Sequence, residues 1–326
     1  MCKLVSIITP CYNGDKYLDK YFQSILSQTY PSIELIFIND GSTDNTERIA
    51  LDYGEKLKEK GYRFFYLAQA NAGQSAAINQ GLRVFNGDYL NWTDADDYLT
   101  DNSIETRVRY LEENPQAGLV IGSTLLVDKQ YQPIGKLEVK DLYRSSRKMV
   151  ESYLRGTFVN PCCSTMVRTG MFKNAMNGVM HIEEVREIGQ NYQLFLPILF
   201  NYPVIFIPEM LSFCVIHPDS HSHSQKSFGQ MIHIQDVTNE TLHHIADRIV
   251  ISKEDKAWFK EKIAEYYFKN RLELLHHYHR KDGLVEIVSQ LKQLDAYDIS
   301  SRKKVLKIKY PFIKKMGDSL WKLKNR

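Results

Sequence analysis

The stretch Asp88-Tyr89-Leu90-Asn91-Trp92 runs directly into Thr93-Asp94-Ala95-Asp96-Asp97. The first half is apolar and rich in β-forming residues, and it predicts a strand; the second half predicts a tight acidic turn. Two or three carboxylates on such a turn are hard oxygen ligands that could hold Mg²⁺ or Mn²⁺ against a diphosphate. An acidic turn alone is most often only solvated, so its meaning depends on the rest of the chain.

The segments before this turn repeat the order of strand, polar turn and helix. The expected strands cover residues 4–9, 33–38, 62–67 and 88–92, and the expected helices cover 17–29, about 46–60 and 74–85. Such alternation predicts a parallel sheet with helices on both faces, whose ligands bind at the carboxyl ends of the strands. Asn13, Asp40, Asn71 and Asp94 each follow a strand, so we expect them on one rim of the sheet.

The second half of the chain has a less regular pattern. Further strands are expected at 118–126, 164–168 and 204–207, with a helix at 190–200. After His223 the spacing predicts helices at 236–251, 253–279 and 284–294. We therefore expect a catalytic α/β domain over residues 1–222 and a helical C-terminal region over 223–326.

The order and spacing of several motifs in the first 100 residues are specific in combination. They are Val5-Ser6-Ile7-Ile8-Thr9-Pro10-Cys11-Tyr12-Asn13, Ser27-Gln28-Thr29-Tyr30-Pro31, Glu34 to Asp44, Asn71 to Gly81, Gly87-Asp88-Tyr89-Leu90 and Asp94-Ala95-Asp96-Asp97. This set resembles the family 2 inverting glycosyltransferases. The resemblance implies a GT-A fold, a Rossmann-related and mainly parallel sheet flanked by helices. It also implies transfer of a sugar from a nucleoside diphosphate, with Mn²⁺ or Mg²⁺ as cofactor.

The resemblance assigns roles to residues at the expected rim. Thr9, Pro10 and Tyr12 would border the nucleobase and ribose. Asp40 would accept a hydrogen bond from the base N3, and a carboxylate there suits a uracil or thymine ring with its N–H donor. A UDP-linked donor is therefore preferred to a dTDP-linked one.

The remaining roles concern the diphosphate, the sugar and the metal. Asn71 and Gly73 would lie beside the diphosphate, and Asp94 would reach the donor sugar or ribose. Asp96 would bind the metal. His217, in preference to His221 or His223, would help to hold the metal or the diphosphate.

Two positions depart from the family pattern. Ile78 stands where the family tends to have Arg. Neutralisation of the donor's negative charge must therefore depend more on the metal or on another basic residue. Gln190-Asn191 replaces the Glu-Asp pair that normally supplies the general base. Amides cannot take a proton at neutral pH, which leaves Glu187, Glu184 or Glu183, and we favour Glu187.

Composition limits compartment and partners. The chain has no apolar run of 18 residues and no secretory leader at its start, so we expect a cytoplasmic protein. Its five cysteines form no CxxC pair, and we expect them to be reduced and mostly buried.

Charge is distributed unevenly along the chain. Residues 301–326 hold ten Lys or Arg against one acid, while the whole chain carries only +3, so residues 1–300 are net acidic. This excludes general nucleic-acid binding by the main body. The basic aromatic tail from Lys303 can lie on the inner face of an anionic membrane, or it can form a helix packed on the catalytic domain. The expected partners are a nucleotide-sugar donor and a saccharide or lipid-linked acceptor.

Two other functions remain to be weighed. A non-catalytic nucleotide-sugar binding protein would keep Asp40 and the acidic turn but lack a base, and the Gln190-Asn191 pair favours it. A dinucleotide-dependent oxidoreductase should show GxGxxG after the first strand, where this chain has Pro10-Cys11-Tyr12-Asn13-Gly14.

Overall fold

The structure is a computed structural model that describes residues 2–138, 146–158, 160–217 and 226–309. The chain divides into two compact units. One comprises residues 1–224 with 248–251, and the other comprises 225–247 with 252–326. The assignment of catalysis to residues 1–222 and of a separate helical region to 223–326 remains a prediction.

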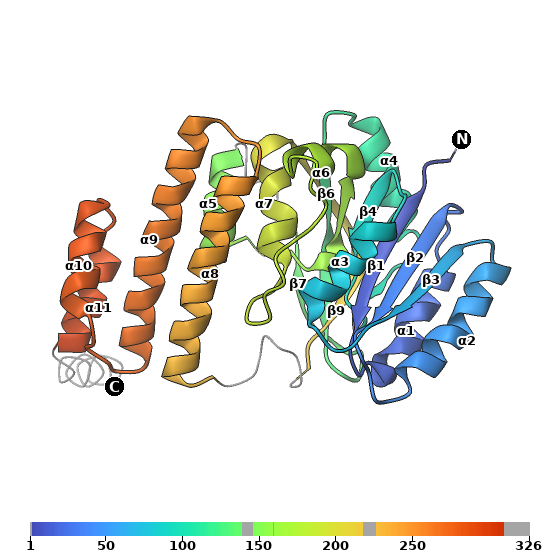
Figure 1. Cartoon of the computed structure of the whole chain (residues 1–326), viewed down its shortest axis with the longest axis horizontal. Helices are drawn as coiled ribbons and strands as arrows, with labels where there is room; N and C mark the ends of the chain where they lie inside the picture. The colour runs from blue at the N-terminus through green and yellow to red at the C-terminus, as the bar shows by residue number, and fades with distance from the viewer. Residues whose placement is uncertain (1, 139–145, 159, 218–225, 310–326) are drawn as a thin grey trace, which may run out of the picture. The chain divides into compact units, whose positions relative to one another are not determined.

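Four neighbouring parallel strands form the first part of the sheet (Figure 1). They are β1 (Val5–Cys11), β2 (Ile33–Asn39), β3 (Arg63–Ala68) and β4 (Tyr89–Trp92), in the spatial order β3-β2-β1-β4. The chain order reverses between β1 and β4, which is where parallel α/β sheets bind ligands. Pro10 was expected to end the first strand, but β1 continues to Cys11. The last β1–β4 pair is Ile8 with Trp92, so the missing N–H of Pro10 breaks no bond on that side.

Helices cover both faces of these strands (Figure 1). Val5, Ile7 and Cys11 share one apolar core with residues of α1 (Asp15–Leu26), α2 (Thr46–Glu59) and α4 (Ser103–Glu113). Ile8 points to the other face and packs against Gly81 of α3 (Gln74–Val84). The alternation of side chains along β1 therefore divides these helices into two layers.

The second part of the sheet is mixed. From β4 it continues through β8 (Thr165–Arg168), β6 (Leu119–Val127), β9 (Val204–Val215) and the short β5 (Tyr98–Leu99), while β7 (Pro133–Leu137) pairs with β6. Only the β6–β9 pair is parallel here. The remaining elements are α5 (Ser146–Leu154), η1 (Cys162–Ser164), α6 (Thr169–Ala175) and α7 (Asn191–Asn201). Together these strands and helices form the GT-A fold.

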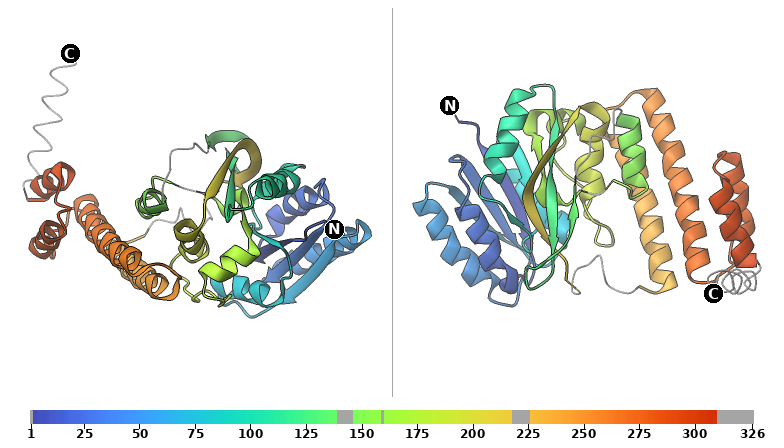
Figure 2. Two further views of the ribbon diagram at one scale, coloured as in Figure 1. Left: turned by 90° about the horizontal axis from the view of Figure 1, so that it is seen from above. Right: turned by 180° about the vertical axis from the view of Figure 1, so that it is seen from behind.

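The second unit is helical and contains α8 (Phe228–Arg248) up to Asp247, α9 (Lys253–His277), α10 (Leu284–Gln293) and α11 (Ile299–Lys309). Helices α8 and α9 lie side by side and antiparallel in both Figure 1 and Figure 2. α8 begins at Phe228 rather than at residue 236, and Phe228, Met231 and Ile232 in its first turns already have the three-and-four spacing of a helix.

The basic C-terminal segment is only partly described. Its first part is α11, whose Val305 and Ile308 join the core that α9 and α10 form. For residues 303–309 the structure thus describes a helix packed within the second unit. Leu306 is exposed, and residues 310–326 lie outside the described residues. Within the described parts, no helix is both long and apolar enough to cross a membrane.

The packing of α3 on β1 gives a stability test. A Cβ at Gly81 would lie 2.5 Å from Ile8 Cγ2, whereas a Cβ at Gly170 in α6 would meet nothing within 4 Å. We expect Gly81→Ala to lower the free energy of unfolding by about 1–3 kcal/mol through overpacking, measured by urea titration. The matched change Gly170→Ala should be neutral or stabilising. Equal effects of the two changes would contradict this packing.

Candidate active site

The loops that follow β1, β2 and β3 meet at one rim of the sheet, as expected from the sequence. The amide of Asp40 donates to the carbonyl of Cys11 (2.8 Å), and the amide of Gln69 donates to the carbonyl of Asn39 (3.0 Å). The amide of Asn13 donates to Ser42 Oγ (2.9 Å). These bonds hold the three loops in register with each other.

The Asp40 carboxylate is the centre of this rim. It is only 3% exposed and accepts three hydrogen bonds, from Gln69 Nε2 (2.7 Å), the Ala72 amide (2.8 Å) and the Gly73 amide (2.8 Å). A carboxylate offers about four acceptor positions, so one is left for a ligand donor. Asp40 therefore fixes the loop before α3 and can still accept a bond from a nucleobase.

Glycine is required at one position in each of the loops that follow β2 and β3. Gly41 has φ +77° and Gly73 has φ +94°, values that L side chains adopt at a cost. A Cβ at Gly41 would also lie 2.7 Å from the Asn71 amide nitrogen. Directly after Gly73, Gln74 Nε2 donates to Asp94 Oδ1 (2.6 Å), which links the loop to the acidic turn.

The three acidic residues of the turn have different environments. Asp97 is buried, accepts from the Val215 amide (3.0 Å) and contacts the thiols of Cys163 and Cys214. Its bond to Val215 makes Asp97 a structural link to β9, and burial raises the pKa of this carboxyl well above its usual value. Burial, together with the charge of Asp96, raises the pKa of Asp94 to about 7.

Asp96 and His217 are brought together by the sheet. Tyr98 of β5 pairs with Phe213 of β9, so the residues after β9 lie beside the turn that precedes β5. His217 Nε2 lies 2.9 Å from Asp96 Oδ2, and the His217 ring stacks on Tyr17 with 4.9 Å between ring centroids. The Asp96 side chain is still 31% exposed and can reach a ligand. His221 and His223 lie outside the described residues.

The pair Asp96 and His217 suits a divalent cation such as Mn²⁺, which accepts carboxylate and imidazole ligands. The electrostatic repulsion between Asp94 and Asp96 is what a bound cation would relieve. Across residues 2–138, 146–158, 160–217 and 226–309, no three His, Cys, Asp or Glu side chains are placed to hold a metal by themselves. The residues therefore fit an ion whose coordination is completed by diphosphate oxygens and water.

The residues expected around the nucleobase differ in what they present. Tyr12 is 51% exposed and carries its ring at the rim. Thr9 is fully buried and its hydroxyl is bonded to Tyr21 Oη, and Pro10 is also buried. Any contact of Thr9 with a nucleotide would have to come from its main chain, because its side chain belongs to the core.

The segment from Ile182 to Gln190 lies against the amino end of α3. Asn79 donates to the Ile182 carbonyl (2.8 Å) and accepts from its amide (2.9 Å). Gln193 of α7 forms the same pair of bonds with the main chain of Glu183. Glu187 is exposed on this segment, next to Arg186, whose Nη2 donates to the Asn71 carbonyl (2.7 Å).

Arg186 was not predicted from the sequence. Its place at the rim depends on the docking of a segment more than a hundred positions away, for which no local pattern gives a signal.

Neutral groups occupy the place where the resemblance implies an acidic pair. Gln190 is buried at the start of α7, and the Cys162 thiol donates to Asn191 Oδ1 (3.0 Å) and lies 3.7 Å from Gln190 Nε2. Burial and the nearby charges of Asp94 and Asp97 raise the pKa of Cys162 well above its usual value. All five cysteines are free thiols, and only Cys2 is fully exposed. No base is present in this cluster.

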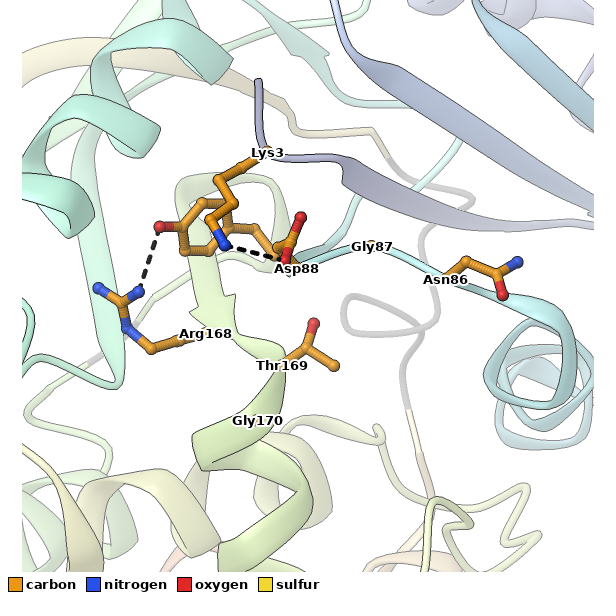
Figure 3. Close-up of a pocket in the computed structure, with 8 residues that line it drawn as sticks. Lys3, Asn86, Gly87, Asp88, Arg168, Thr169 and Gly170 are labelled. Carbon is orange, nitrogen blue, oxygen red and sulfur yellow. Dashed lines mark hydrogen bonds and ion pairs between the residues drawn. The ribbon is translucent and has the colours of Figure 1, made fainter. Parts of the chain in front are cut away.

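A pocket of about 370 Å³ lies at the ends of the strands opposite to the rim (Figure 3). Lys3, Gly87 and Asp88 precede β1 and β4, and Arg168 ends β8. Its charged groups already have partners: Lys3 Nζ lies 3.3 Å from Asp88 Oδ1, and Arg168 Nη1 donates to Tyr89 Oη (3.2 Å). The rim, rather than this pocket, collects the residues that suit a nucleotide.

Comparison with known proteins agrees with the fold and the rim. The sequence model for Glycosyl transferase family 2 matches residues 6–175, just over half of the chain. The chain is a member of this family of glycosyltransferases.

The chain is 28% identical over 279 residues to an uncharacterized glycosyltransferase of Rickettsia felis, covering 82% of the chain and 43% of that protein. It is 30% identical over 221 residues to one of Rickettsia typhi, covering 66% and 64%. The chain thus spans less than half the length of the first of these relatives. The crystal structure of S. aureus TarS 1-349 in complex with UDP-GlcNAc has a similar fold, with a TM-score of 0.63, 15% identity and coverage of 89% of this chain and 80% of that fragment.

The contact between Gly41 and the Asn71 loop can be tested by a matched pair of substitutions. Gly41 and Gly61 both have positive φ, at +77° and +92°, but only a Cβ at Gly41 meets other atoms. Gly61→Ala should lower the free energy of unfolding by about 1 kcal/mol, which is the cost of holding alanine at a positive φ. Gly41→Ala should lower the thermal unfolding midpoint clearly further. The same midpoint for both variants would show that the loops after β2 and β3 do not meet as described.

Proposed function

We propose that this chain transfers a hexosyl or related residue from a UDP-linked donor to an acceptor hydroxyl, with inversion at the anomeric carbon. The observation that carries the proposal is the chain of hydrogen bonds from Asp40 through Gly73 and Gln74 to Asp94, with Asp96 and His217 beside it. The roles proposed for these residues, from Asp40 at the base to Asp94 at the sugar, follow the order of the groups in a nucleotide sugar. The choice of a uracil or thymine ring rests on the remaining acceptor position of Asp40, which matches the N3–H donor that both rings carry.

The chemistry is a single displacement. The acceptor oxygen attacks the anomeric carbon on the face opposite the diphosphate, the carbon–oxygen bond to the diphosphate breaks, and its electron pair stays on the β-phosphate. The acceptor proton passes to a carboxylate base. Asp96 and His217 would hold the divalent cation, which offsets the charge of the leaving diphosphate when bound.

Glu187 is the base we propose. It is exposed on the segment that borders the amino end of α3, next to Arg186, whose guanidinium reaches the Asn71 carbonyl at the rim. A non-catalytic nucleotide-sugar binding protein is the second candidate, since Gln190 and Asn191 engage Cys162 instead of providing a carboxylate.

We place the reaction in the synthesis of a surface polysaccharide or glycolipid, with a saccharide or lipid-linked acceptor. Contact with the inner face of the membrane is part of this proposal. It would depend on the basic segment that begins with α11, most of which lies outside the described residues.

The metal requirement is tested by titrating UDP calorimetrically with and without Mn²⁺ into the wild type and Asp96→Ala. Removing the exposed carboxylate should abolish the gain in affinity that Mn²⁺ gives, a loss of about 10-fold or more. Release of UDP from a panel of UDP-sugars then identifies the donor. Metal-dependent binding without turnover, with acceptors supplied, would favour the binding protein, and no binding of UDP or dTDP would exclude both functions.

The identity of the base is tested by Glu187→Gln, with Glu184→Gln as the matched control on the same segment. Loss of the proton acceptor should reduce kcat by about 10² to 10⁴-fold with the dissociation constant of UDP unchanged, measured by UDP release with acceptor present. The control should retain most of its kcat. Comparable activity in Glu187→Gln and the wild type would assign the base to another residue.

A further inference from the structure

The rim carries an excess of negative charge. Asp40, Asp94 and Asp96 lie within one hydrogen-bonded set of loops, and among the described residues none of them forms an ion pair with Lys or Arg. A nucleoside diphosphate would add further negative charge. Binding it therefore calls for a protein cation at the rim in addition to a metal ion.

Helix α3 does not supply that cation. Ile78, which stands where related enzymes tend to have Arg, is 0% exposed and lies in the apolar layer on the face of the sheet that α3 covers. The basic residue of α3 is Arg83, which lies in the last turn of the helix, far along it from Gly73, and donates to Gln80 Oε1 (3.2 Å).

Arg186 reaches the rim from a different part of the chain. Its Nη2 donates to the Asn71 carbonyl (2.7 Å), and its aliphatic stem lies over Gly73, where a Cβ would be 3.2 Å from Arg186 Cγ. The side chain is exposed, so four of its five N–H donors have no hydrogen bond to the described protein residues. Arg186 thus contacts both residues expected beside the diphosphate, Asn71 through its guanidinium and Gly73 through its aliphatic stem.

The segment that carries Arg186 is held firmly in place. Asn79 binds both main-chain groups of Ile182, Gln193 binds both of Glu183, and Ser75 Oγ donates to the Val185 carbonyl (3.4 Å). All three side chains belong to helices that pack in the same unit. Such support holds a guanidinium near its working position and lowers the entropy lost when it binds an anion.

From these contacts we propose that Arg186 binds the diphosphate of the nucleotide sugar and replaces the cation that Ile78 removes. This inference rests on the proposed function and adds a named binding residue to it. The planar guanidinium can donate two parallel bonds to phosphate oxygens, and as the glycosidic bond breaks it offsets the charge left on the diphosphate.

The test is calorimetric titration of uridine, UMP and UDP in Mn²⁺ into the full chain, comparing the wild type, Arg186→Gln, Arg186→Lys and Arg83→Gln. Loss of a charged donor should weaken UDP binding about 10-fold to 100-fold in Arg186→Gln and leave uridine binding unchanged. The UDP affinity of Arg186→Lys should fall between those of the wild type and Arg186→Gln, because lysine keeps the positive charge but cannot donate two parallel hydrogen bonds. Arg83→Gln removes the same charge from an exposed site on α3 and should bind UDP as the wild type does.

Two results would overturn the assignment. UDP affinity in Arg186→Gln equal to that of Arg83→Gln would show that Arg186 does not contact the diphosphate, and the proposed function would stand on the wild-type binding. Equal weakening of uridine and UDP would show that Arg186 only positions the Asn71 loop. Failure of the wild type to bind UDP would instead exclude the proposed function itself.

Discussion

The arrangement of the rim depends on the buried carboxylate of Asp40. Three donors from the segment Gln69 to Gly73 converge on it, so the loop after β3 takes its course from a side chain at the end of β2. A buried carboxylate is stable only when such bonds replace its hydration. The same bonds set the start of α3, and through Gln74 they position Asp94. The positions of Asn71, Gly73 and the acidic turn relative to one another therefore depend on the Asp40 carboxylate.

A second constraint is the pairing of β5 with β9. Because the acidic turn runs straight into β5, that pairing fixes the turn against the end of β9, and Asp97 reinforces it through the Val215 amide. His217 follows β9 by two positions and thereby meets Asp96. The three carboxylates of the turn therefore have different surroundings: Asp97 binds the main chain of β9, while Asp94 and Asp96 are the two that the proposed function assigns to the ligand.

Much of the first 100 residues could be predicted because local patterns determine it. The strands from Val5 to Trp92 are apolar and separated by polar turns, and the loops at their carboxyl ends fall on one rim for topological reasons. Helix α4 was not expected, although Ile104, Val108 and Leu111 have a helical spacing; the buried face they form also includes the charged Arg107, whose Nη2 donates to the Cys163 carbonyl (2.7 Å). Arg186, the buried state of Thr9 and the structural role of Asp97 depend on contacts between distant segments, and no spacing encodes them.

The central claim is that one nucleoside diphosphate binds across the loops after β1 to β4. The most direct measurement is amide hydrogen exchange of the full chain with and without UDP and Mn²⁺, read by mass spectrometry. Binding at the rim should give new protection in residues 11–14, 40–45, 69–74 and 93–97 together. Protection confined to residues 86–89 and 168–170, which line the pocket at the opposite ends of the strands, would contradict the claim.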